Sequence, residues 1–201
     1  MSKKRVFYIV FFVVLILGFY AALSAIIPGF NEKKVPPISY VRPFSFTDQY
    51  GKAFTNQNVA GKVYVVEYFF TTCKGICPRM NNNMKKVFDR FKGEKDFLIL
   101  SHTCDPEIDS VPVLKRYSDS IGATSTNWIF LTGRKDSLYN MARVSYAIDD
   151  PQDKLADNTA FLHTQYWAVV NKKGEVVKIY DGLEQNAVTE LMEEVEKLLK
   201  D

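Results

Sequence analysis

The sequence predicts an α/β domain, with a central mixed sheet flanked by helices, that follows an N-terminal transmembrane helix. Three observations predict this class. Residues 6–27 form an uncharged apolar run. Beyond it, short β-branched or aromatic runs alternate with segments of helical periodicity, a pattern typical of βαβ units around a parallel sheet. A late pair of such runs, at 164–170 and 175–180, flanks a polar turn and predicts an antiparallel hairpin.

Composition limits the possible functions. The 26 basic and 23 acidic residues leave a net charge of +3. No Lys/Arg-rich block with interleaved aromatic residues occurs, so nucleic-acid binding is not expected. Three cysteines among 201 residues are too few for a disulfide scaffold. The odd number indicates one working pair and one further cysteine.

The N-terminal run has the length of a membrane span. As a helix, residues 6–27 are expected to be about 33 Å long, close to the ~30 Å hydrocarbon core of a bilayer. Residues 1–5 carry three basic side chains and are expected to form a cytoplasmic tail under the positive-inside rule. We therefore expect a single-pass anchor in the cell (inner) membrane, a proline-rich tether at 28–38, and a domain at 39–201 on the periplasmic or extracytoplasmic side.

A cleaved signal peptide is the alternative, because Ala22-Leu23-Ser24 has the small-x-small pattern of a cleavage site. The apolar run is much longer than the roughly 7–15 residues of a typical signal-peptide core, which favours a retained anchor. Both interpretations export the domain.

The exported segment divides into alternating elements. A hairpin is expected over 44–55, around a turn at 48–51. Residues 62–70 are almost continuously apolar, as in a strand buried on both faces. Pro78 begins a helix that ends at Gly93. The other elements follow in order: strands at 97–104 and 128–131, a helix capped by Asp109 or Ser110 and running to about Ile121, helices at 135–145 and 185–200, the late hairpin, and a polar loop at 149–162.

Cys73 and Cys77 lie between the first core strand and the helix that begins at Pro78. Reactive groups collect at the carboxyl ends of strands in open α/β sheets. Unpaired backbone N–H groups at the start of the helix stabilise negative charge, so we expect a lowered thiol pKa. The pair can form an intramolecular disulfide or present two sulfur ligands to one soft metal ion.

The spacing of the pair favours metal binding. Three residues separate the cysteines, whereas thioredoxin-type redox motifs have two. The wider loop suits a chelate but does not forbid redox cycling. An inert disulfide is less favoured, because so short a loop removes little entropy from the unfolded chain. A peroxidase of the peroxiredoxin type, with Arg79 near one reactive thiol, is disfavoured by the paired arrangement.

His163 is one of two histidines and lies just before a predicted strand, where a histidine is most often a surface or hydrogen-bonded residue. If the loop entering that strand meets the carboxyl end of the first core strand, His163 becomes a third ligand. Two thiolates and one imidazole suit copper, since thiolates favour Cu(I) and imidazole tolerates Cu(II). Structural zinc needs a fourth ligand, which would have to be Cys104 or His102.

His102 and Cys104 end the second strand and point to one face, being two residues apart. If that strand neighbours the first, Cys104 approaches Cys73 and lies beside the metal ligands rather than among them. The simpler interpretation is a small, half-buried Cys104 and a His102 in the core or at its rim. Asp105 follows directly, and its carboxylate can orient site groups by hydrogen bonding.

Four blocks occur in order along the exported segment: FFTTCKGICP at 69–78, SHTCDPEID at 101–109, WIFLTG at 128–133, and His163-Thr164. Together they resemble the SCO/SenC family, the copper-binding assembly factors of cytochrome c oxidase, over about residues 40–200. The resemblance implies a thioredoxin fold. It also implies copper, as Cu(I) or Cu(II), bound by Cys73, Cys77 and His163.

The function that the resemblance implies is that of a metallochaperone rather than an enzyme. Such a protein delivers copper to the binuclear centre of the copper-receiving subunit of cytochrome c oxidase. Some family members look like thiol–disulfide reductants that prepare the target's cysteines. An exported thiol–disulfide oxidoreductase, with Cys73 and Cys77 as its redox pair, is therefore the alternative.

The sequence departs from the family pattern at three places. Lys74-Gly75-Ile76 stands where the family often has Pro and an acidic residue, and Leu162 stands where an acidic residue commonly precedes the histidine. Cys104 occupies a position usually held by a residue without a thiol. The three implied ligands are retained, whereas the local charge departs from the family pattern, so the resemblance does not fix the copper affinity or the redox potential.

Overall fold

The computed structural model describes residues 2–27, 36–123, 126–148 and 164–201. Contacts divide the chain into two compact units, Met1–Pro36 and Pro37–Asp201. The first contains helix α1 (Lys3–Ile26), whose 24 residues are long and apolar enough to cross a membrane. A signal sequence near an N-terminus has the same properties, so the retained anchor stays a prediction.

The second unit is built on an eight-stranded mixed sheet with the order β1-β8-β7-β4-β5-β6-β2-β3. The pairs β4–β5 and β5–β6 are parallel, and the other neighbours are antiparallel. This confirms the predicted mixed sheet with a late hairpin. The strands are β1 (Ser39–Tyr40), β2 (Ser45–Asp48), β3 (Ala53–Thr55), β4 (Val63–Phe69), β5 (Phe97–Thr103), β6 (Trp128–Thr132), β7 (Tyr166–Val170) and β8 (Glu175–Asp181).

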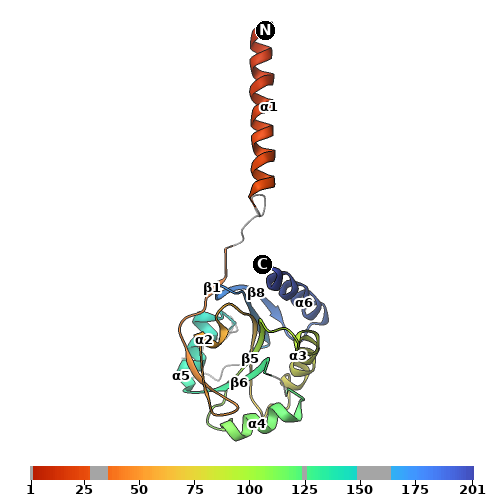
Figure 1. Cartoon of the computed structure of the whole chain (residues 1–201). Helices are drawn as coiled ribbons and strands as arrows, with labels where there is room; N and C mark the ends of the chain where they lie inside the picture. The colour runs from red at the N-terminus through yellow and green to blue at the C-terminus, as the bar shows by residue number, and fades with distance from the viewer. Residues whose placement is uncertain (1, 28–35, 124–125, 149–163) are drawn as a thin grey trace, which may run out of the picture. The chain divides into compact units, whose positions relative to one another are not determined.

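Helices pack on both faces of this sheet (Figure 1). The helices are α2 (Asn56–Val59), α3 (Cys77–Phe91), α4 (Val111–Ser120), α5 (Lys135–Asn140), the π-helical turn η1 (Met141–Ser145) and α6 (Gln185–Lys200). Side chains of α3, α4 and α6 fill one core, which we call the α3 core. Side chains of α2, α5 and η1 fill the opposite core, the α5 core.

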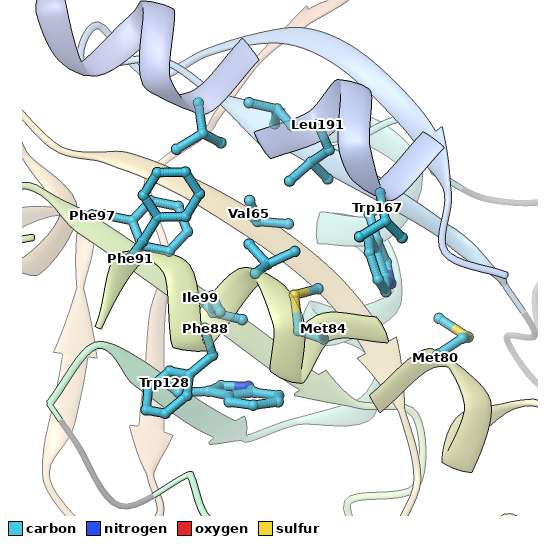
Figure 2. Packing of buried hydrophobic residues seen from close by; sticks show 14 of the residues in the cluster. Val65, Met80, Met84, Phe88, Phe91, Phe97, Ile99, Trp128, Trp167 and Leu191 are labelled. Carbon is cyan, nitrogen blue, oxygen red and sulfur yellow. The ribbon is translucent and has the colours of Figure 1, made fainter. Parts of the chain in front are cut away.

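Strand β4 separates the two cores and is buried at all seven positions. Its alternate side chains Val63 and Val65 enter the α3 core, while Tyr64 and Val66 enter the α5 core. Figure 2 shows the α3 core, in which the helices cover Val65 with large apolar side chains such as Leu191. The nearly continuous apolar sequence of this strand follows from its burial on both faces.

Several local features differ from the predictions. The predicted helix 135–145 changes to π-helical geometry at Met141. Ser110 occupies the N-cap of α4 but makes no side-chain cap hydrogen bond, and Asp109 uses its carboxylate elsewhere. Strand β1 and helix α2 have no counterpart among the predicted elements. The predicted loop 149–162 and His163 lie outside the described residues.

Candidate functional site

The thiol pair lies where β4 ends and α3 begins, as predicted. Cys73 is half-buried in the connecting loop, and its N–H donates to the Phe70 carbonyl at 3.2 Å. Cys77 is buried and is the first residue of α3, which has Pro78 in its first turn. Proline at this point needs no N–H partner and has the backbone angle of a helix, so it fixes where the helix starts. Both cysteines are free thiols.

The two thiols have different protonation behaviour. Burial acts to raise the pKa of Cys73, but hydrogen bonds from Cys77 and from the backbone N–H groups of Gly75, Ile76 and Cys77 outweigh it, and the net pKa is lowered. Burial raises the pKa of Cys77, and its hydrogen bond to Cys73 adds to the rise. The site therefore combines a half-buried thiol of lowered pKa at Cys73 with a buried, protonated partner at Cys77.

A cavity of about 550 Å³ opens beside the pair, and its lining includes Cys73, Cys77, Cys104 and Thr164. The Thr164 hydroxyl donates to the Ile148 carbonyl at 2.5 Å. This hydrogen bond joins the residues on either side of the segment 149–163. Thr164, the residue that follows His163, is therefore fixed at the wall of the thiol cavity.

Cys104 reaches the same cavity from the neighbouring strand. Its N–H donates to the Phe69 carbonyl at 2.8 Å, because β5 lies beside β4 in parallel register. The side chain is buried, and burial raises the pKa of its thiol well above the usual value. Cys104 thus shares the cavity with Cys73, as the sequence suggested, but as a protonated thiol.

His102 is a core residue, which was the simpler of its two interpretations. It is fully buried, lies among Phe46, Tyr68 and Tyr146, and neither ring nitrogen has a hydrogen-bond partner among the described residues. Burial lowers its pKa to about 3. Within the described residues no group of three or more His, Cys, Asp or Glu side chains is arranged to hold a metal ion.

Two acidic residues near the thiols were not predicted as site residues. Glu67 is fully buried in β4 and accepts a hydrogen bond from the Ser101 hydroxyl at 2.5 Å. Burial raises its pKa to about 7, against the opposing effect of that hydrogen bond. An isolated glutamate within an apolar strand was the available signal. The second residue is Asp109, which was predicted as a helix cap.

Asp109 and Asp105 both contribute to the turn that follows β5. The Asp105 carbonyl accepts the Asp109 N–H at 2.8 Å, and the Asp105 N–H donates to the Thr103 hydroxyl at 2.9 Å. The carboxylate that reaches the thiol loop is that of Asp109, which accepts from Thr71. The orienting role of the Asp105 carboxylate stays a prediction.

A thiol pair at the start of the helix that follows the first parallel strand of a mixed sheet defines a thioredoxin-like domain with a reactive or metal-binding dithiol. A model of the SCO1/SenC family matches residues 32–200 of this chain. The chain therefore belongs to the SCO1/SenC family.

Individual relatives agree with this assignment. The SCO1 protein homolog of Bacillus subtilis is 30% identical over 162 residues, which span 79% of this chain and 83% of the relative. The structure of BsSco, described as a Sco-family cytochrome c oxidase assembly protein with a disulfide switch, matches with a TM-score of 0.68 and 28% identity over 81% of this chain and 95% of its own. Yeast Sco1 with copper bound matches with a TM-score of 0.60 and 26% identity over 79% and 89%. The predicted thioredoxin-like fold is confirmed.

Proposed function

We propose that this protein is a membrane-anchored copper metallochaperone that delivers copper to the binuclear copper centre of cytochrome c oxidase during its assembly. The observation that carries the proposal is the thiol pair at the start of α3, one member of which has a lowered pKa beside an open cavity. Support comes from yeast Sco1, which was crystallised with copper, and from BsSco, which is described as an oxidase assembly protein.

The proposed ligands are Cys73, Cys77 and His163. Thr164 supports the third ligand because it lines the thiol cavity, and consecutive Cα atoms are about 3.8 Å apart. Two thiolates with one imidazole form a donor set that copper accepts in both of its common oxidation states. We propose that α1 retains the domain at the extracytoplasmic side of the membrane.

The difference between the two thiols gives an order to copper capture. Cys73, the more accessible thiol and the one with the lowered pKa, binds first, whereas Cys77 must lose its proton when it binds. Copper binding therefore releases a proton, and the apparent Cu(I) affinity is expected to rise with pH between 6 and 8. Competition with a chromophoric Cu(I) chelator at several pH values measures this rise; an affinity independent of pH would contradict it.

The test of the ligand set is a copper titration of the full chain in detergent micelles, with metal analysis. The wild type is expected to bind one copper per monomer tightly, and His163→Ala is expected to abolish tight binding. His102→Leu is the matched control, because it removes the other histidine, which lies in the α5 core. Full affinity in the His163→Ala protein would rule out the three-ligand site.

A thiol–disulfide oxidoreductase is the second candidate. The pairing of an accessible thiol of lowered pKa with a buried thiol favours it, because the first attacks a disulfide and the second resolves the mixed disulfide. The disulfide switch of BsSco is consistent with such chemistry in a relative. This function needs both cysteines but not His163. Turnover of a disulfide substrate by His163→Ala, without a copper defect in cells, would favour it over the metallochaperone.

A further inference from the structure

Asp109 lies just before α4 and is fully buried between the ends of β4 and β5. Its carboxylate accepts hydrogen bonds from the Thr71 N–H at 3.2 and 3.4 Å, from the Thr71 hydroxyl, and from the Thr103 hydroxyl at 2.5 Å. A buried carboxylate with several donors forms stronger hydrogen bonds than neutral groups do. Asp109 therefore ties the loop after β4 to the end of β5.

Residues 69–71 lead from β4 into the loop that carries the thiols, and we call them the stem of the thiol loop. The Phe69 carbonyl is bound to the Cys104 N–H, and the Phe70 carbonyl accepts the Cys73 N–H. Thr71 comes next and stands two residues ahead of Cys73, bound to Asp109 through both its N–H and its hydroxyl. The position of Thr71 thus determines the direction in which the chain enters the loop.

The path of that loop sets the surroundings of the Cys73 sulfur. Gly75 and Ile76 direct their backbone N–H groups to this sulfur, and Cys77 supplies both a backbone and a side-chain hydrogen bond. These donors act only if the loop turns back over Cys73, and the turn starts from the stem at Thr71. A shift of the stem would separate the sulfur from its donors and would change the separation of the two thiols.

We propose that Asp109 is a positioning residue of the thiol site, which acts through Thr71 to hold Cys73 and Cys77 in the arrangement that binds a metal ion and that fixes the surroundings of the Cys73 sulfur. The part of the proposal that concerns copper rests on the proposed function. The part that concerns thiol reactivity does not, because it applies to the metal-free protein under either candidate function.

The experiment compares Asp109→Asn, Thr71→Val and the double variant with wild type, as full chains in detergent. Asp119→Asn is the control for the aspartate, since Asp119 is exposed on α4 in an ion pair with Lys115. Thr189→Val, at an exposed position on α6, is the control for the threonine. Three quantities are measured: Cu(I) affinity by chelator competition, the rate of Cys73 alkylation by iodoacetamide at pH 7 with mass spectrometry, and the midpoint of thermal unfolding.

Asp109→Asn and Thr71→Val are each expected to weaken Cu(I) binding about 10-fold, which is the lower end of the range for residues that orient metal ligands. Cys73 alkylation is expected to slow, because the sulfur loses donors that stabilise its thiolate. The double variant should be little worse than the weaker-binding single variant, since both changes remove the same contact. The two controls should match wild type.

Three results would overturn the proposal. Faster alkylation in Asp109→Asn would show that the carboxylate acts as a repelling charge rather than through the stem. Unchanged affinity and alkylation with a lower unfolding midpoint would leave Asp109 a purely structural role. Strictly additive effects of the two substitutions would show that they act separately. If wild type fails to bind Cu(I) while alkylation still slows in the stem variants, the proposed function fails and the positioning role stands.

Discussion

The two faces of the central sheet bury ionisable side chains in contrasting ways where β4 and β5 end. On the face of the α3 core, Glu67 accepts a hydrogen bond from Ser101, and Cys77 is hydrogen-bonded to Cys73. On the face of the α5 core, His102 lies among aromatic rings with no partner for either nitrogen among the described residues. Side chains are buried on both faces, and the two faces differ in the hydrogen bonds that those side chains make.

The register of β4 and β5 places the compared side chains at adjacent positions of the two strands. Glu67 is paired with Ser101, and Tyr68 with His102, in one parallel ladder, so that successive positions point to opposite faces. Burial without donors favours the neutral form of a side chain, whereas hydrogen bonds from donors favour the charged form of an acid. We infer that the α3 face holds one group, Glu67, whose charge changes near neutral pH, and that His102 on the α5 face is a neutral group that packs.

The largest expected effect is a difference in Cu(I) affinity between variants of the Cys77 thiol on the α3 face and of the Cys104 thiol on the α5 face. Cys77→Ser is expected to weaken Cu(I) binding by more than the roughly 100-fold that loss of an orienting partner can cost, because it removes a proposed ligand. Cys104→Ser is expected to change the affinity only a few-fold, since the Cys104 thiol is buried and protonated. Chelator competition measures both affinities.

Cys104→Val serves as a second variant in the same experiment, because valine fills the apolar wall without a polar atom. Its affinity should equal that of wild type within a few-fold. If Cys104→Ser or Cys104→Val bound Cu(I) as poorly as Cys77→Ser, the contrast between the two faces would fail and Cys104 would be a ligand.

The next effect concerns the acid stability of the α5 face. His102 has a pKa of about 3 in the folded protein and an ordinary value of 6.5. Between these values the unfolded chain binds more protons, so stability falls as the pH falls below 6.5. At 1.36 kcal/mol per pH unit, this residue is expected to cost about 2.5 kcal/mol between pH 7 and pH 4.5.

Urea unfolding of the metal-free protein at these two pH values measures the loss. His102→Leu is expected to lose about 2.5 kcal/mol less than wild type on acidification. His163→Ala removes the other histidine and is the control, which should keep the acid sensitivity of wild type. An equal loss in wild type and His102→Leu would show that His102 becomes protonated without unfolding.

Much of the fold could be predicted because its signals are local. The continuous apolar run gave β4, and apolar residues at helical spacing after Pro78 gave α3. Strand β1 has two residues and is held by its pairing with β8, so no local sequence pattern predicts it. The π-helical turn at Met141 likewise could not be predicted, because the helical spacing of apolar residues continues through it unchanged.

The site was predictable only in part, for the same reason. Cys73, Cys77 and Pro78 lie close together in the sequence, so their pattern could be recognised locally. The partner of Asp109 is Thr71, which is 38 residues away, and an aspartate before a helix has the pattern of a cap. Tertiary hydrogen bonds of this kind depend on which strands become neighbours, and a single sequence does not fix that order.

The smallest expected effect concerns Glu67 and has the opposite sign to that of His102. The pKa of Glu67 is about 7 in the folded protein, and its ordinary value is 4.5. Between these values the folded chain holds more protons, so stability falls as the pH rises, by about 2 kcal/mol from pH 5.5 to pH 8. Glu67→Gln is expected to lack this loss, and urea unfolding of the metal-free protein measures it.

Glu193→Gln, at an exposed position on α6, is the matched control and should lose stability with rising pH as wild type does. If Glu67→Gln kept the full loss, Glu67 would be ionised in the folded protein at pH 5.5 and the α3 face would not hold a group that titrates near neutral pH. If the loss disappears, the two faces respond to pH in opposite directions. A carboxyl group that can exchange its proton near pH 7 then lies in the same core as Cys77, the thiol that must release a proton to bind copper.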